Sequence, residues 1–263
     1  MYRLVATDLD GTLLDAAGEV SPRTREVISA LEERGVVVVF VTGRPLRWME
    51  TLWEHVGDHG LAVCSNGGIV YDVRTHRVVR SRTIPRATGL EVADRLRSEL
   101  PGTAYALERL DGIAVEREFG LRFPPPADLR VGPLEEYFEP DAVVKLLAKH
   151  DAHDPEPYWH RVEELVGDLV TTTWSSVGTL VEMSADQVTK ATTLADLCRD
   201  RGIAPDEVVA FGDMPNDLAM LTWAGRSYAM ANAHAQVRRA ADAVAPRHDE
   251  DGVARTLEEL FDL

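Results

Sequence analysis

Six consecutive apolar residues, from Val36 to Val41, constrain the fold of this chain more than any other segment. Five of them are valine, and a strand built from this run would be apolar on both faces. Strands of that kind lie in the centre of a parallel sheet whose faces are covered by helices. A helix is predicted just before the run, because Ser21 and Pro22 suit its start and Gly35 suits its end.

The alternation of strands and helices around this run predicts an α/β fold. Leu4–Thr7 and Leu61–Cys64 are apolar segments of strand length on either side of it. A strand, a helix and a strand at this spacing form a right-handed crossover unit. The alternation returns near the C-terminus, where we expect helices at 190–201, 216–222 and 253–261 and strands at 208–211, 227–230 and 243–245.

The middle of the chain has a different pattern. Helices expected at 88–100 and 159–166 are mixed with more polar strands at 142–148 and 169–175. The simplest arrangement is one α/β domain made of residues 1–82 and 187–263. A second, α+β domain of residues 83–186 is then inserted into it.

Charge and composition exclude several classes of partner. The chain has 28 basic and 44 acidic residues, a net charge of −16, which repels nucleic acids and anionic lipid. No stretch approaches the roughly 20 apolar residues of a membrane helix, and the N-terminal apolar segment is too short for a signal peptide. We therefore expect a cytoplasmic protein, in which Cys64 and Cys198 are buried thiols. An anionic substrate would need a local positive cluster.

Acidic and polar residues follow three of the predicted strands directly. The segment Asp8–Thr12 (DLDGT) comes after the first strand, and Thr42-Gly43-Arg44 comes after the second. Gly212–Asp217 (GDMPND) comes after the strand at 208–211. Because the carboxyl ends of parallel strands meet at one edge of a sheet, we expect these groups to lie close together.

Each segment also has a simpler interpretation. The segment Asp8–Thr12 can be an acidic turn, and Gly212–Asp217 can be a loop that caps a helix. Thr42 can also cap a helix, and Lys190 can be a surface lysine. Their combination favours a site, because clustered carboxylates repel one another unless a cation neutralises them. Magnesium prefers oxygen ligands, so Asp8, Asp213 and a nearby backbone carbonyl predict a magnesium site. Arg44 and Lys190 would add the positive charge.

Taken together, these segments resemble the haloacid dehalogenase superfamily of phosphohydrolases. The resemblance is carried by DLDGT at Asp8, TGR at Thr42, Lys190, and GDMPND at Gly212. More narrowly, the chain is similar to the Cof-like sugar-phosphatase branch, which has a large cap between the second and third motifs. Further matches to this branch are at 65–68, 180–183, 232–233 and 250–254. The resemblance covers essentially the whole chain.

A Rossmann-like parallel-sheet core with an inserted α+β cap, which governs substrate specificity, is the fold that this resemblance implies. It also assigns roles by position. Asp8 would be the nucleophile and a magnesium ligand, and Asp10 the general acid and base, with its backbone carbonyl on the metal. Thr42 and Lys190 would hold the transferred phosphoryl group, and Asp213 would be the third magnesium ligand. Further substrate contacts would be Gly43, Arg44, Asn66 and Asn216, with Asp217 in a supporting role.

The implied activity is magnesium-dependent hydrolysis of a small phosphate monoester, such as a sugar phosphate, through an aspartyl phosphate. Two alternatives remain: a phosphomutase, which returns the phosphoryl group to a sugar, and a non-catalytic protein that binds phosphorylated ligands on the same fold. The identity of the substrate and the choice between monomer and homodimer are left open. Candidate contacts with anionic or sugar groups in the cap are Arg117, Arg122, Lys145 and Lys149, although surface charge is the simpler interpretation of each and the one that we favour.

In one departure from the branch, Ala191 stands where glycine usually follows the motif lysine. Alanine is a good helix former, so we expect a tighter start of the helix and no loss of activity.

Overall fold

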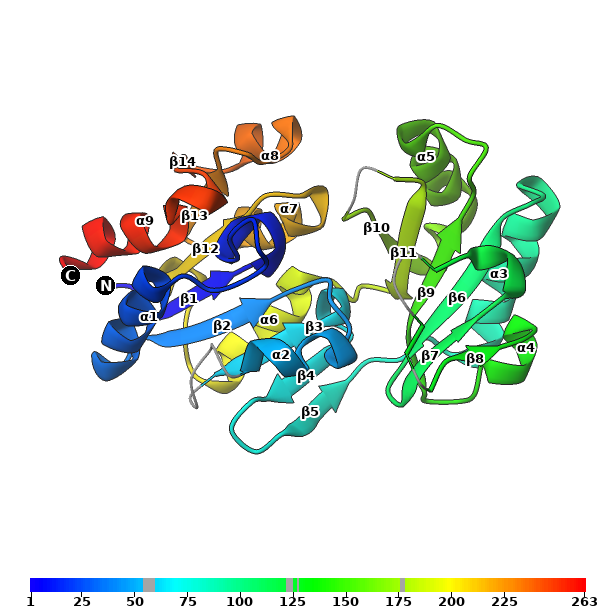
Figure 1. Ribbon diagram of the computed structural model, residues 1–263, viewed down its shortest axis with the longest axis horizontal. Helices are drawn as coiled ribbons and strands as arrows, with labels where there is room; N and C mark the ends of the chain where they lie inside the picture. The colour runs from blue at the N-terminus through cyan, green and yellow to red at the C-terminus, as the bar shows by residue number, and fades with distance from the viewer. Residues whose placement is uncertain (54–59, 122–124, 127, 176–177) are drawn as a thin grey trace. The chain divides into compact units, whose positions relative to one another are not determined.

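The computed structural model describes residues 1–53, 60–121, 125–126, 128–175 and 178–263 (Figure 1). The chain divides into two compact units, described separately below. The first comprises Met1–Arg80 and Thr189–Leu263, and the second comprises Ser81–Val188. Of the candidate cap residues, Arg122 lies outside the described residues.

An eight-stranded sheet forms the centre of the first unit, in the order β14-β13-β12-β1-β2-β3-β4-β5. Neighbouring strands from β14 to β3 are parallel, and β4 runs antiparallel to β3. The strands are β1 (Leu4–Thr7), β2 (Val37–Val41), β3 (Leu61–Cys64), β4 (Ile69–Asp72), β5 (Arg77–Ser81), β12 (Val208–Gly212), β13 (Arg226–Met230) and β14 (Ala243–Ala245).

The helices of the first unit carry buried apolar side chains, and all but α2 contact strands of this sheet closely. They are α1 (Pro22–Glu33), α2 (Glu50–Trp53), α6 (Lys190–Asp200), α7 (Leu218–Trp223), α8 (Ala235–Ala240) and α9 (Gly252–Phe261). Helix α1 begins as predicted: the side chain of Ser21 accepts from the backbone N–H of Thr24, and Pro22 takes the first position. Helix α1 packs beside α9, and α6 beside α7 (Figure 1). The central strands β1 and β12 are therefore buried along their whole length.

In its described residues, the second unit has a mostly antiparallel sheet of six strands, in the order β10-β11-β9-β6-β7-β8, and the β7–β8 pair is parallel. Its strands are β6 (Ala104–Arg109), β7 (Gly112–Val115), β8 (Arg130–Val131), β9 (Val143–Lys149), β10 (Val170–Thr173) and β11 (Leu180–Ala185). Its helices are α3 (Arg86–Glu99), α4 (Leu134–Tyr137) and α5 (Pro155–Val166). Leu96 of α3 and Val162 of α5 join Leu107 and Leu146 of the sheet in one apolar core.

The predicted fold class, a parallel α/β core with an inserted α+β domain, is confirmed. The helix predicted at 216–222 begins instead at Leu218, because a tight turn over Pro215–Asp217 precedes it. The interpretation of Thr42 as a helix cap is wrong, since the next helical turn is preceded by Pro45. In the parts of the chain that the structure describes, no helix combines the length and apolarity needed to cross a bilayer.

Candidate functional site

Residues at the carboxyl edge of the parallel sheet meet in the first unit. Asp8 follows β1, Thr42 follows β2, Asn66 follows β3 and Asp213 follows β12. Lys190 joins them as the first residue of α6. Neighbouring parallel strands end at the same edge, so the predicted motifs come together although they are far apart in sequence.

Lys190 is the centre of a buried ion cluster. Its Nζ donates to Oδ1 of Asp8 at 2.5 Å and to Oδ1 of Asp217 at 2.6 Å. The side chains of Lys190 and Asp217 have no exposed surface, and that of Asp8 is 8% exposed. Burial alone would lower the pKa of Lys190, but the carboxylates of Asp217 and Asp8 outweigh it and raise that pKa. The lysine is therefore a fixed positive charge beside Asp8.

Three carboxylates surround this single ammonium. Oxygens of Asp8, Asp213 and Asp217 all lie within 4.8 Å of one another. Burial, with the nearby carboxylates Asp217 and Asp213, raises the pKa of Asp8 well above its ordinary value against the attraction of Lys190. Burial and then Asp217 raise the pKa of Asp213 to about 7. The cluster lacks positive charge, and an oxygen-rich site of this kind fits a divalent cation such as magnesium.

Within the cluster the three carboxylates are not equivalent. Oδ1 of Asp217 accepts from Lys190, and its Oδ2 accepts from the backbone N–H groups of Asp213 at 3.0 Å and Met214 at 3.1 Å. Asp217 thus organises the loop that carries Asp213. From the described residues, the side chain of Asp213 receives one hydrogen bond, from the hydroxyl of Thr12 at 3.1 Å. Asp8 and Asp213 therefore have more oxygen capacity left for a ligand than Asp217 has.

Gly11 brings the first loop close to Asp213. Its φ of +76° lies in the left-handed region that favours glycine. A Cβ at this position would lie 3.0 Å from Cγ of Asp213 and closer still to Oδ2. The carbonyl of Gly11 accepts from the side chain of Asn232 at 2.8 Å, and Oδ1 of Asn232 accepts from the N–H of His248 at 3.0 Å. The segment Asp8–Thr12 is therefore tied to the C-terminal part of the unit.

Arg44 forms an ion pair with Asp10 through two hydrogen bonds. Its Nε donates to Oδ2 of Asp10 at 2.7 Å, and a terminal nitrogen donates to Oδ1 at 2.6 Å. The buried Thr42 hydroxyl accepts from the backbone N–H of Arg44 at 3.0 Å. The carboxylate of Asp10 is not among those that gather around Lys190.

Three further predicted residues form a polar group beside this pair. The side-chain N–H of Asn216 donates to Oδ1 of Asn66 at 3.0 Å. Asn66 has a φ of +53°, a conformation that asparagine tolerates better than most residues. A Cβ on Gly43 would lie 3.1 Å from Oδ1 of Asn66, so glycine leaves room there. The structure thus brings Gly43, Asn66 and Asn216 together.

Sequence reasoning gave no role to Thr12 or Asn232, although both lie in the motifs. The signal for Asn232 was the C-terminal match at 232–233, and only the fold shows its contact with Gly11. In the second unit, Lys145 is buried with Glu182 at 3.4 Å, and Lys149 pairs with Asp151 at 3.0 Å. Arg117 is exposed.

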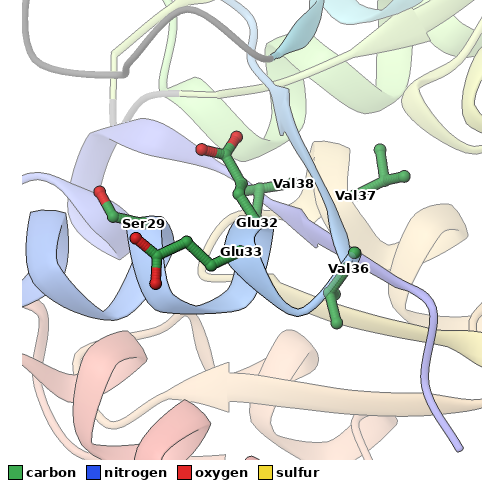
Figure 2. A pocket seen from close by; sticks show the side chains of 7 residues that line it. Ser29, Glu32, Glu33, Val36, Val37 and Val38 are labelled. Atoms are coloured by element: carbon green, nitrogen blue, oxygen red, sulfur yellow. The ribbon is translucent and has the colours of Figure 1, made fainter.

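A surface hollow near the start of β2 is a different feature (Figure 2). It lies beside the end of α1, and Figure 2 shows the side chains of Glu32 and Glu33 along it. Of its lining residues, Val37 and Val38 begin β2 and Val36 precedes it, at the opposite end of the strand from Thr42. Its acidic lining would repel a phosphate, so it is not a candidate for the site.

Comparison with known proteins gives consistent matches over the whole chain. A family model described as haloacid dehalogenase-like hydrolase matches residues 5–257. Phosphatase YwpJ of Bacillus subtilis is 29% identical, over 98% of this chain and 100% of that protein. A phosphoglycolate phosphatase of Methanopyrus kandleri is 30% identical, over 100% of this chain and 98% of its own. A solved haloacid dehalogenase-like hydrolase from B. subtilis superposes with a TM-score of 0.84 at 26% identity, covering 98% and 99% of the two chains.

Proposed function

The chain belongs to the haloacid dehalogenase-like hydrolase family, and on that premise we propose that it hydrolyses a small phosphate monoester through an aspartyl phosphate on Asp8. The resemblance seen in the motifs, to this superfamily and its Cof-like branch, is confirmed, as is the expectation of a phosphatase-type hydrolase. The observation that carries the proposal is the buried contact of Asp8 with Lys190 beside Asp213.

Asp8 suits a nucleophile because its two oxygens differ. Oδ1 is held by Lys190, and among the described residues no hydrogen bond reaches Oδ2. In-line attack by Oδ2 on phosphorus forms the aspartyl phosphate and breaks the ester P–O bond, whose electron pair leaves with the departing oxygen. Asp10 gives a proton to that oxygen and later takes one from the water that hydrolyses the intermediate.

Magnesium is the cation that we propose for the acidic cluster. Its protein ligands would be the carboxylates of Asp8 and Asp213 and the backbone carbonyl of Asp10. Support comes from three carboxylates that face one ammonium within a buried site. When bound, the ion would neutralise charge on the phosphoryl oxygens.

Lys190 and the residues around it are proposed to hold the phosphoryl group. An ammonium has three N–H donors, and among the described residues two of those on Lys190 go to Asp8 and Asp217, which leaves one for a phosphoryl oxygen. Thr42 and Gly43 border the same edge, together with Asn216, whose side chain is oriented by Asn66. Donors placed before the reaction begins stabilise the transferred group at little cost of reorganisation.

The second unit, residues 81–188, is proposed to set substrate specificity, because the first unit already contains all the groups that the chemistry needs. We propose a phosphorylated metabolite, such as a sugar phosphate, as the substrate class. One relative is named for phosphoglycolate, which is also a small anionic phosphate ester. The proposed setting is the cytoplasm, where the buried thiols of Cys64 and Cys198 would stay reduced. A monomer or a homodimer stays a prediction.

Asp8→Asn tests the proposed function directly. The amide keeps the shape of the side chain but cannot attack phosphorus, so we expect release of phosphate from a panel of phosphorylated metabolites to fall to background. Circular dichroism should show a native spectrum for the variant. Chelation should abolish the wild-type activity, and added magnesium should restore it.

Three outcomes would contradict the proposal. Near-normal release of phosphate by Asp8→Asn at matched purity would remove Asp8 from the mechanism. Isomerised sugar phosphate in place of inorganic phosphate would identify a mutase. Tight binding of a phosphorylated ligand without turnover would identify a binding protein.

A further inference from the structure

Asp10 depends on one partner for its position. Its carboxylate is 58% exposed, and the two bonds from Arg44 are the only hydrogen bonds that its side chain receives from the described residues. A carboxylate with so much exposed surface and no other hydrogen bond from the described residues would rotate freely in solvent if those bonds were lost. The orientation of Asp10 is therefore set by Arg44.

Arg44 itself is anchored to the sheet. Its backbone N–H donates to the hydroxyl of Thr42 at 3.0 Å, and its carbonyl accepts from the N–H of Ser65 at 3.0 Å. The N–H of Thr42 in turn donates to the carbonyl of Val63 at 2.8 Å. The guanidinium thus projects from a backbone fixed between the ends of β2 and β3. A planar fork on such an anchor holds a carboxylate in both position and plane.

We propose that Arg44 is a positioning residue that aims the Asp10 carboxyl group at the leaving oxygen, and that contact with the phosphoryl group is not its main task. The proposal rests on the function proposed above, because Asp10 needs aiming only if it transfers a proton. In the first step the Asp8–phosphorus bond forms, the ester P–O bond breaks, and the proton of Asp10 passes to the departing oxygen. Both Asp10 oxygens accept from Arg44 in this structure.

Two leaving groups distinguish this role from phosphate binding. An alkyl phosphate expels an alkoxide, which needs a proton, whereas p-nitrophenyl phosphate expels a stable nitrophenolate that needs none. Because kcat/KM reports only the steps up to release of the leaving group, it separates this proton transfer from the later hydrolysis. If the Asp10 carboxyl group is no longer oriented toward the leaving oxygen, kcat/KM should therefore fall much more for the alkyl phosphate than for p-nitrophenyl phosphate.

The experiment compares kcat/KM of Arg44→Ala with both substrates, using the most active alkyl phosphate of the metabolite panel. We expect about a 100-fold loss with the alkyl phosphate and less than about a threefold loss with p-nitrophenyl phosphate. Asp10→Asn should show the same selectivity. With the alkyl phosphate, kcat/KM of the double variant Arg44→Ala/Asp10→Asn should fall no further than that of Asp10→Asn alone, because both substitutions remove the same proton transfer. Arg44→Lys, which keeps the charge but not the fork, should fall between wild type and Arg44→Ala.

Arg74→Ala is the matched control, since Arg74 is an exposed arginine in the turn between β4 and β5 of the same unit. It changes the net charge equally and should leave both substrates unaffected. Equal losses on the two substrates for both Arg44 variants would assign Arg44 to the shared phosphoryl group and overturn the proposal. No loss with either substrate would overturn it too. Failure of the proposed function would show separately, as activity retained in Asp8→Asn.

Discussion

Gly11→Ala is expected to damage the magnesium site through a steric clash that can be worked out from the structure. The new Cβ would lie 3.0 Å from Cγ of Asp213, and ordinary contact begins at 3.4 Å, so Cγ must move by at least 0.4 Å and Oδ2, which would lie closer still, must move farther. Metal–ligand distances are held within about 0.2 Å, so this displacement exceeds what coordination tolerates. Asp213 has little freedom to adapt, because it is buried and bonded to Thr12. We expect the magnesium affinity to fall about 10- to 100-fold.

Gly18→Ala is the control for the backbone. Gly18 has a φ of +79°, close to that of Gly11, but nothing lies within 4 Å of its added Cβ. Gly18→Ala should lose about 1 kcal/mol of unfolding free energy in urea, because alanine resists the left-handed conformation. Gly11→Ala should lose that amount and more, because it also crowds the buried side chain of Asp213. Only Gly11→Ala should need more magnesium for half-maximal activity. If the two variants have the same magnesium requirement, Asp213 is not a ligand of the ion or does not meet residue 11 as described.

Two predictions on stability accompany it. In Gly89→Ala the new Cβ would overlap the buried ring of Phe138. Crowding should cost about 1–3 kcal/mol, more than the roughly 1 kcal/mol gained in helix propensity, and a urea midpoint at or above the wild-type value would contradict this. Asn232→Ala removes the bond to the carbonyl of Gly11 at 2.8 Å and leaves the N–H of His248 without its acceptor. The unfolding free energy should drop by about 1–3 kcal/mol, and an unchanged value would show that these bonds add nothing to stability.

Much of the fold follows from local sequence. The strands at Leu4–Thr7, Leu61–Cys64 and Ala243–Ala245 have the predicted bounds, because short apolar runs between polar loops allow little else. Strand β5 (Arg77–Ser81) was not foreseen. It lies at the edge of the sheet, where Arg77, Val78 and Val79 are exposed, so it has no apolar periodicity to reveal it.

The position of the candidate site could also be predicted from the sequence, since the order of parallel strands decides which loops share an edge. The pairing of its charged side chains could not be predicted. Arg44 reaches Asp10 across 34 residues, and Lys190 reaches Asp8 across 182. Which cation takes which carboxylate depends on side-chain directions and on distances of a few ångströms, and these exist only once the strands are packed. The periodicity that defines strands and helices is a local property of the sequence, whereas the tertiary structure determines which charged side chains pair.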